Sequence, residues 1–303
     1  MENSDTLAGL RRRAQPLLGT LVEVAITVPT EGVLLSATGP AFACIAEIHR
    51  AMSFHDADSD VRRLARTPAG ACLTLNPHTW QVLSLALELE ALSAGTFNVA
   101  VAPALVAAGL LPVPEGAPQP QARSLAEGIA LLEGDRLRVL APVWIDLGGI
   151  AKGYAVDCAV DCLQKLGIGS GLVNAGGDMR AFGIVEHPIH LRFAHGLRRV
   201  AVLQNGALAS SGPAGANSPR ARSSHTLSPH TLSPHAQGPQ TSSPHIDPHR
   251  GVAVPAPHSV VVQAPTAAVA DALTKVALLA PATADRLCPG LRAQWRAFDT
   301  LDP

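Results

Sequence analysis

The stretch DLGGIAKGYAVD, residues 146–157, places a carboxylate, a glycine turn and a lysine in an order that suits anion binding. Its Lys152 is one of only three lysines among 23 basic residues. If Asp146 ends a strand and a helix starts after Gly148-Gly149, free backbone N–H groups and the positive end of the helix dipole meet at the turn, a geometry that binds phosphate. Lys152 would add a compact charge against a diphosphate oxygen. The alternative is a solvated lysine in the first helical turn.

The familiar nucleotide motifs do not fit this stretch. A dinucleotide-binding fingerprint would need glycine where Ile150 stands, and a P-loop would need Gly-Lys-Ser/Thr where the order is Lys152-Gly153-Tyr154. The stretch is therefore neither a dinucleotide dehydrogenase motif nor a Walker motif.

Composition bounds the remaining classes. The chain has 303 residues, of which 47% are hydrophobic and 16% charged, so it can build a substantial core as one large domain or two modest ones. The net charge is -1 and aromatic residues make up only 3%. A phosphate-backbone binder needs a basic face and a single-strand binder needs aromatic platforms, so we expect no nucleic acid partner.

Targeting signals are weak. The N-terminal MENSDTLAGLRRRAQ has no apolar stretch before its arginines and no lipidation-style cysteine, although Arg11–Arg13 faintly resemble a twin-arginine signal. The longest apolar runs are interrupted by Glu88, Glu90, Asp271 or Lys275, so we expect no transmembrane segment. Five irregularly spaced cysteines suit reduced thiols in a cytoplasm.

Hydrophobic periodicity predicts alternating strands and helices. We expect a helix opened by Pro77 and ended by Gly95, a proline-rich connector at 110–122, and a helix from about Ala151 to Leu166 stopped by Gly167. In the helix at 151–166, we expect a polar face that contains Asp157, Asp161 and Lys165. The other expected elements are a strand at 17–28, a helix at 41–55, a strand pair at 137–147 broken at Pro142, strands within 172–184 and 197–210, a strand and helix within 260–280, and a short tail.

Residues 213–243 differ in composition from the rest of the chain. The unit TLSPH occurs at 226–230 and again at 231–235, and a third SPH ends at His245. Proline, serine and histidine cannot fill a core, so we predict a disordered insertion. Its histidines, together with His245 and His249, could bind Ni²⁺, Cu²⁺ or Zn²⁺, so a histidine-rich metal-binding or scaffold protein remains one alternative.

Several short motifs in order resemble the ApbE family, the FAD:protein FMN transferases. They are LGT at 18–20, MSFHDADSDVRRL at 52–64, GTFNVAVAPAL at 95–105, the glycine-turn stretch, LVNAGGDMRAFG, ALASSG, HIDPHRG, and SVVVQAP followed by ADAL. The resemblance covers nearly the whole chain except the tails and the histidine-rich insertion.

The resemblance implies an α+β fold with an internally duplicated β-α-β arrangement and a nucleotide cleft between the halves. It implies a single domain at 15–303 after a flexible tail at 1–14. The implied reaction transfers the FMN moiety of FAD onto a Thr or Ser hydroxyl of an acceptor protein and releases AMP, with Mg²⁺ at the diphosphate. We expect a cytoplasmic location from the lack of a signal peptide, whereas the family habit allows a periplasmic one.

The resemblance also assigns roles to single residues. His245 matches the histidine of the HxxDP motif and is the candidate base. Metal binding falls to the Gly149 carbonyl, the Asp271 carboxylate and, one residue away from the expected threonine, Thr274. For Asp271, capping of a helix start is the plain alternative. FAD contacts fall to Met52, Thr96, Phe97, Asn98, Asp146, Lys152 and Ile246, and for Met52 core packing is an equal explanation.

Three departures from the family pattern bear on activity. Phe97-Asn98-Val99-Ala100 stands where FDxT is usual, and the HxxDP spacing is one residue short. Lys275 occupies the position of the metal-binding threonine, four residues after Asp271. It is either an exposed helix lysine or a partner of Asp271 whose ammonium stands in for one metal charge. A catalytically weakened FAD-binding relative, or an FAD pyrophosphatase, is therefore a second alternative.

Overall fold

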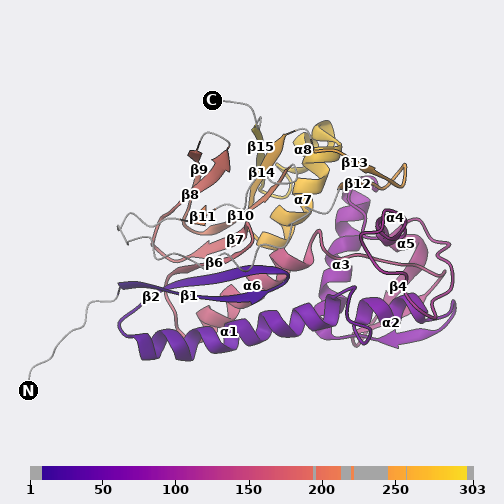
Figure 1. The fold of residues 1–303 in the computed structure, drawn as a ribbon, viewed down its shortest axis with the longest axis horizontal. Coiled ribbons are helices and arrows are strands. Elements are labelled where there is room, and N and C mark those ends of the chain that lie inside the picture. Colours follow the sequence, from indigo (N-terminus) through magenta and orange to yellow (C-terminus); the bar gives the residue numbers. More distant parts are fainter. Residues whose placement is uncertain (1–8, 194–195, 213–219, 222–244, 257, 299–303) are drawn as a thin grey trace, which may run out of the picture.

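The computed structural model describes residues 9–193, 196–212, 220–221, 245–256 and 258–298. These residues form a helix layer on a seven-stranded sheet, with a smaller helical lobe beside it (Figure 1). The fold is therefore α+β, as expected. The predicted internal duplication stays a prediction.

The large sheet has the strand order β1-β2-β6-β7-β10-β14-β15, and its neighbouring strands pair antiparallel. Strands β6 and β7 form a hairpin through Gly176 and Gly177, whose positive φ angles of 65° and 113° favour glycine. The strands are β1 (Gly9–Leu17), β2 (Thr20–Val28), β6 (Gly171–Ala175), β7 (Asp178–Phe182), β10 (Gly206–Ser211), β14 (Ser259–Ala264) and β15 (Gln294–Phe298).

Three helices pack on one face of this sheet: α1 (Glu31–Met52), α6 (Ala151–Lys165) and α7 (Ala267–Leu279). Their inward residues join the inward strand residues in one apolar core. The opposite face is covered by the hairpin of β8 (His187–Phe193) and β9 (Gly196–Leu203), over a smaller core that contains Met179, Leu191 and Leu208. The strongly apolar strands are thus buried on both faces.

The smaller lobe consists of short helices around a three-stranded sheet of order β3-β5-β4 (Figure 1). A short hairpin of β12 (His245–Asp247) and β13 (Val252–Val254) lies against α4. The lobe contains α2 (Asp60–Arg66), β3 (Cys72–Thr74), α3 (Pro77–Leu92), α4 (Ala102–Ala107), α5 (Leu125–Gly128), β4 (Ile129–Leu132) and β5 (Arg136–Val139).

Several local signals act as predicted. Pro77 opens α3 after Asn76, whose side chain accepts a hydrogen bond from the His78 N–H. Gly95 and Gly167 follow α3 and α6 with φ angles of +78° and +81°. Local chemistry alone therefore set these helix boundaries.

Other predictions were wrong. Strand β1 begins at Gly9, so residues 9–14 belong to the sheet and not to a tail. Its alternation was hidden because Arg11 and Arg13 lie on the more buried side, where Arg13 bonds to the Thr38 hydroxyl. Residues 143–147 are not a strand, and the Asp146 N–H bonds to the Val99 carbonyl instead. The predicted C-terminal tail contains α8 (Pro281–Leu287) and β15. The predicted helix at 41–55 begins earlier, at Glu31.

The predicted insertion at 213–243 lies outside the described residues, apart from 220–221. Those two residues form β11 (Arg220–Ala221), which pairs with β8. The histidine-rich repeats are not among the described residues.

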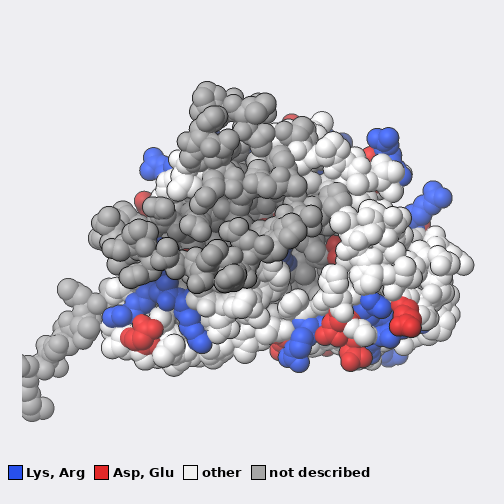
Figure 2. Space-filling model, viewed as in Figure 1, with Lys and Arg blue, Asp and Glu red and all other residues white. Residues whose placement is uncertain are grey.

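Two surface features bear on partners. Among the described residues, α1 is the one helix long and apolar enough to cross a membrane by length and composition, and its inward residues pack in the core. Buried core helices pass the same test, so the expected lack of a transmembrane segment stays a prediction. On the face drawn in Figure 2, acidic and basic side chains are intermixed along the lower edge. The expected lack of a nucleic acid partner stays a prediction.

Candidate functional site

Helices α6 and α7 approach each other most closely at Gly153. A Cβ atom at this position would lie 2.2 Å from the Ala267 carbonyl oxygen, so the crossing requires glycine. This contact brings the first turn of α6 beside Asp271, which lies in the second turn of α7. Helix packing therefore explains why glycine stands at position 153, between Lys152 and Tyr154.

Each of the two helices donates backbone N–H groups to an aspartate of the other. Asp271 is 1% exposed and accepts a hydrogen bond from the Gly153 N–H at 3.4 Å. Asp157, on α6, accepts the N–H groups of Ala267 and Ala268, both at 2.9 Å. Asp157 shares a polar face with Asp161 as predicted, since both pair with one arginine, but Asp157 is only 8% exposed.

Two lysine ammonium groups surround the Asp271 carboxylate. Lys152 Nζ lies 2.6 Å from Asp178 Oδ2 and 3.7 Å from Asp271 Oδ2. Lys275 Nζ bonds to Asp271 Oδ1 and, at 3.1 Å, to the Asp271 carbonyl oxygen. The lysine side chains are 33% and 21% exposed, whereas those of Asp178 and Asp271 are 5% and 1% exposed. The lysine side chains are thus more exposed than the carboxylates with which they pair.

The first turn of α6 is less open than predicted. The Ala151 N–H bonds to the Leu147 carbonyl and the Gly153 N–H bonds to Asp271, so these two groups are not free. Lys152 is not a solvated first-turn lysine either, because it is paired with Asp178. An anion approaching this turn therefore meets lysine ammonium groups before backbone amides.

Burial and charge set the protonation of the cluster. Burial raises the pKa of Asp271, but Lys152 and Lys275 outweigh it, and the net pKa is lowered. Burial lowers the pKa of Lys152, but Asp178 and Asp271 outweigh it, and the net pKa is raised. For Asp178, burial and the charge of Asp271 raise the pKa despite Lys152. Lys152 and Asp271 are consequently held in their charged forms.

His245 lies at the edge of this cluster, at the start of β12. Burial and the charge of Lys275 lower its pKa to about 4, against a hydrogen bond with the Gly212 backbone that raises it. The imidazole is therefore neutral near pH 7 and able to accept a proton. The charge of Lys275, which bonds to Asp271, thus acts on His245. The role of His245 as the base stays a prediction.

Asp146 lies in a buried loop that faces the same cations. Its carboxylate accepts the Gly148 N–H at 3.3 Å. Burial raises its pKa, and the charges of Lys152, Lys275 and His55 oppose that rise. Asp146 thus joins the cluster, and His55 is a neighbour to which the sequence analysis gave no role.

The other predicted FAD contacts surround a loop of the smaller lobe. The side chains of Met52 and Phe97 are 5% and 3% exposed and belong to the main apolar core, so they offer little surface to a ligand. Thr96 is 8% exposed. The Asn98 amide donates to the Arg123 carbonyl and accepts the Ala100 N–H, which commits it to its own loop. Ile246, 8% exposed, follows His245 in β12.

The predicted metal ligands come together only in part. Gly149 and Asp271 are close, but the Lys275 side chain lies between them: its Cε would be 3.2 Å from a Cβ at Gly149. The Thr274 hydroxyl is buried, donates to the Asp271 carbonyl at 2.6 Å and lies 2.9 Å from the Ser211 hydroxyl. In the described part of the chain, no group of three or more His, Cys, Asp or Glu residues could hold a metal ion. These residues do not fit Mg²⁺.

Asp178 and Ser211 are the partners that the sequence analysis missed. Asp178 follows two glycines with positive φ and begins β7, inside the LVNAGGDMRAFG motif, in which the family resemblance assigned no role to a single residue. A tight Gly-Gly turn directly before an acidic residue was the available signal. Ser211 ends β10, and nothing in the local sequence connects it with Thr274, which lies 63 residues further along the chain.

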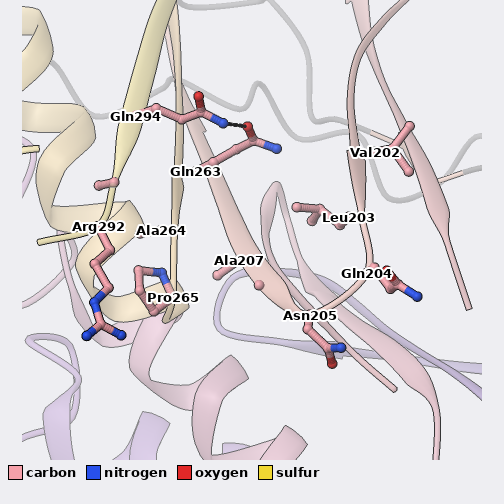
Figure 3. Close-up of a pocket in the computed structure, with 12 residues that line it drawn as sticks. Val202, Leu203, Gln204, Asn205, Ala207, Gln263, Ala264, Pro265, Arg292 and Gln294 are labelled. Carbon is pink, nitrogen blue, oxygen red and sulfur yellow. Dashed lines mark hydrogen bonds between the residues drawn. The ribbon is translucent and has the colours of Figure 1, made fainter. Parts of the chain in front are cut away.

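A separate pocket of ≈ 690 Å³ lies at the other end of the sheet (Figure 3). It is lined by Asn205, Gln263, Pro265 and Arg292, among others. Its Gly206 and Ala207 begin β10, whereas Ser211 at the end of β10 contacts the ionic cluster. The pocket is therefore distinct from the candidate site.

Solved structures of flavin transferases share this fold. The apo form of Pseudomonas stutzeri flavinyl transferase ApbE matches with a TM-score of 0.73 at 23% identity, covering 99% of this chain and 94% of that one. Flavin transferase ApbE from Vibrio cholerae matches with a TM-score of 0.73 at 20% identity, covering 97% and 95%. The molecule is thus an α+β protein of the ApbE fold.

The sequence gives the family directly. Residues 18–243, more than half of the chain, match the model of the ApbE family. This chain belongs to the ApbE family. The matched range includes Lys152 and Asp178 but ends before His245, Asp271 and Lys275, so those three residues are placed by the structure and not by the family match.

Two curated relatives match over a shorter range. A FAD:protein FMN transferase from Vibrio cholerae serotype O1 is 30% identical over 158 residues, which is 50% of this chain and 47% of that protein. A FAD:protein FMN transferase from Haemophilus influenzae is 27% identical over 154 residues, 46% of this chain and 44% of that protein. The chain thus matches about half the length of these relatives.

Proposed function

We propose that this chain transfers the FMN moiety of FAD to a Ser or Thr hydroxyl of an acceptor protein and releases AMP. One observation carries the proposal: the buried His245, whose pKa is lowered by burial and by the charge of Lys275, accompanies lysine ammonium groups that pair with buried carboxylates. Family membership and the names of the two relatives, FAD:protein FMN transferase, support the same activity.

The two lysines would bind the diphosphate of FAD. An ammonium group has three N–H donors, so Lys152 and Lys275 can keep their carboxylate partners and still donate to phosphate oxygens. Their partial exposure makes them reachable from solvent. The buried carboxylates beneath would fix both ammonium groups in place before the ligand arrives, which lowers the cost of ordering them.

His245 would act as the general base. The acceptor hydroxyl oxygen attacks the phosphorus on the FMN side of the diphosphate, and a new phosphoester bond forms. The bond from that phosphorus to the bridging oxygen breaks, and AMP leaves with the electron pair. The hydroxyl proton passes to His245, which its low pKa keeps unprotonated.

The remaining predicted contacts are proposals of unequal weight. Asp146 and Ile246 lie next to the cluster or to His245, so we keep them as FAD contacts. Met52, Thr96, Phe97 and Asn98 would act by shaping the loop around the ligand, because their side chains are buried or bonded to backbone. No step is assigned to Mg²⁺, and a cytoplasmic location remains our expectation.

The test is transfer of flavin to an acceptor, read by in-gel fluorescence and by AMP release. The protein is incubated with FAD and a domain carrying a Ser/Thr flavinylation site. We expect His245→Ala to lower the transfer rate by about a hundredfold or more, with FAD affinity little changed. His49→Ala, on α1 and away from the cluster, is the matched control.

The pH profile adds a second readout. A base with its pKa at about 4 is neutral above that pH, so kcat/KM should persist well below pH 6.5 and fall with a midpoint near pH 4. AMP release without labelled acceptor would instead favour an FAD pyrophosphatase. Deletion of residues 217–243 should leave flavin binding intact under the proposed function and under the pyrophosphatase alternative, whereas the histidine-rich alternative predicts that the deletion abolishes function.

A further inference from the structure

The acceptor atoms of Asp271 are already occupied by hydrogen-bond donors. Oδ1 bonds to Lys275 Nζ, and Oδ2 accepts the Gly153 N–H at 3.4 Å with Lys152 Nζ at 3.7 Å. The Asp271 carbonyl oxygen accepts the Thr274 hydroxyl at 2.6 Å and Lys275 Nζ at 3.1 Å. A magnesium ion needs oxygen lone pairs in a near-octahedral arrangement, and at this residue it would compete with two ammonium groups and a backbone N–H.

Lys275 crosses the space between the two residues that the family resemblance assigns to the metal. Its aliphatic chain packs on Gly149, with Cε 3.2 Å from the position of a Cβ there, and its ammonium group reaches Asp271. Glycine at 149 leaves room for this chain. The lysine side chain is only 21% exposed, so packing on one side and two hydrogen bonds on the other hold the charge in place.

The third expected ligand cannot take part. A helix turns by about 100° per residue, so a threonine one position earlier points to a different side of α7. Thr274 is fully buried, and its hydroxyl pairs with Ser211 at 2.9 Å. A cation beside Asp271 would therefore lack the threonine hydroxyl and would compete with two ammonium groups for the carboxylate.

We infer that the Lys275 ammonium takes the place of the divalent cation, so that this chain binds FAD and transfers FMN without a metal ion. The part concerning FAD rests on the proposed function, and the part concerning the metal does not. An ammonium is a compact point charge with three donors, able to hold Asp271 and a phosphate oxygen together. It brings one positive charge where Mg²⁺ brings two, and Lys152 supplies another nearby.

Direct metal binding tests the exclusion. Mn²⁺ is titrated into the full chain, and free Mn²⁺ is followed by electron paramagnetic resonance. Lys275→Thr removes the ammonium and restores a hydroxyl four residues after Asp271. We expect this variant to bind Mn²⁺ at least about tenfold more tightly than the wild type. Lys165→Thr, the same change at an exposed lysine of α6, should behave like the wild type.

Measuring FAD affinity tests whether the Lys275 ammonium replaces the divalent cation in FAD binding. Wild-type affinity should be the same in EDTA and in MgCl2, whereas Lys275→Thr should lose about tenfold in EDTA and regain affinity in MgCl2. Thermal melting verifies that the variants are folded, and Lys275→Ser supplies a hydroxyl if the threonine variant is not.

Three results would overturn the inference. The first is that the wild type binds Mn²⁺ as tightly as Lys275→Thr does, in competition with Mg²⁺. The second is that neither protein binds Mn²⁺, because Lys275 is then not what excludes the ion. The third is that the wild type loses its FAD affinity in EDTA. A wild type that binds no FAD under any condition would instead refute the proposed function, while the Mn²⁺ titration still tests the lysine.

Discussion

Two buried aspartates, Asp157 and Asp271, each place a carboxylate between two helices, and they pair with different cations. Each lies between α6 and α7 and accepts backbone N–H groups from the first turn of the other helix. Asp157 is further paired with Arg180, which also bonds to Asp161. Asp271 is paired with two lysines.

We relate the different cations to different roles: Asp157 joins the two helices, and Asp271 positions the lysines of the candidate site. Arg180 is held on two carboxylates, and despite it burial raises the pKa of Asp157 to about 6. Around Asp271, lysine charges outweigh burial and the pKa is lowered. Because an ammonium is small and can rotate its donors, lysine can pair with a buried carboxylate and still meet a ligand. This explains why a chain rich in arginine has lysine at these two positions.

Replacing Gly153 should break both arrangements at once and has the largest expected effect. In Gly153→Ala the new methyl group would lie 2.2 Å from the Ala267 carbonyl oxygen and 2.7 Å from the Ala268 nitrogen. Both are backbone atoms, so the helices must move apart, and we expect the free energy of unfolding to fall by about 3 kcal/mol. Urea denaturation measures it.

Gly39→Ala is the matched control. It is also a helical glycine, and a Cβ there meets no atom within 4 Å. It should leave stability unchanged or raise it by up to about 1 kcal/mol. Equal stability of the two variants would show that the close helix crossing is wrong.

Removing Asp157 should damage stability and spare the site. Asp157→Ala leaves two buried N–H groups of α7 and one side of Arg180 without their acceptor, so we expect a loss of about 2–3 kcal/mol. Asp161→Ala, whose side chain is 54% exposed, should stay within about 0.5 kcal/mol of the wild type. FAD affinity of the folded protein, measured by flavin fluorescence, should be unchanged in both. A large loss of affinity in Asp157→Ala would erase the distinction between the two aspartates.

Local signals in the sequence predicted the features that depend on neighbouring residues. Pro77, Gly95 and Gly167 fixed helix boundaries, and the i,i+4 spacing of Asp271 and Lys275 correctly suggested their pairing. The family and the α+β fold followed from ordered short motifs.

Long-range partners could not be predicted in this way. Asp157 has the helical spacing of the exposed Asp161, yet it is buried and its partners Ala267 and Ala268 lie 110 and 111 residues away. The pairing of Lys152 with Asp178 depends on a hairpin turn placing β7 beside α6. The edge strands β1 and β15 gave no clear pattern because only part of each is buried.

The central claim is that the Lys152 ammonium, held by Asp178 and Asp271, binds the diphosphate of FAD. Replacing Lys152 tests this claim most directly. Lys152→Ala and the exposed Lys165→Ala are titrated with FAD and, for comparison, with riboflavin, which lacks phosphate. We predict that Lys152→Ala weakens FAD binding by at least about tenfold and leaves riboflavin binding unchanged, while Lys165→Ala alters neither. Equal FAD affinities in the two variants, or an equal loss for FAD and riboflavin in Lys152→Ala, would contradict the phosphate-binding role.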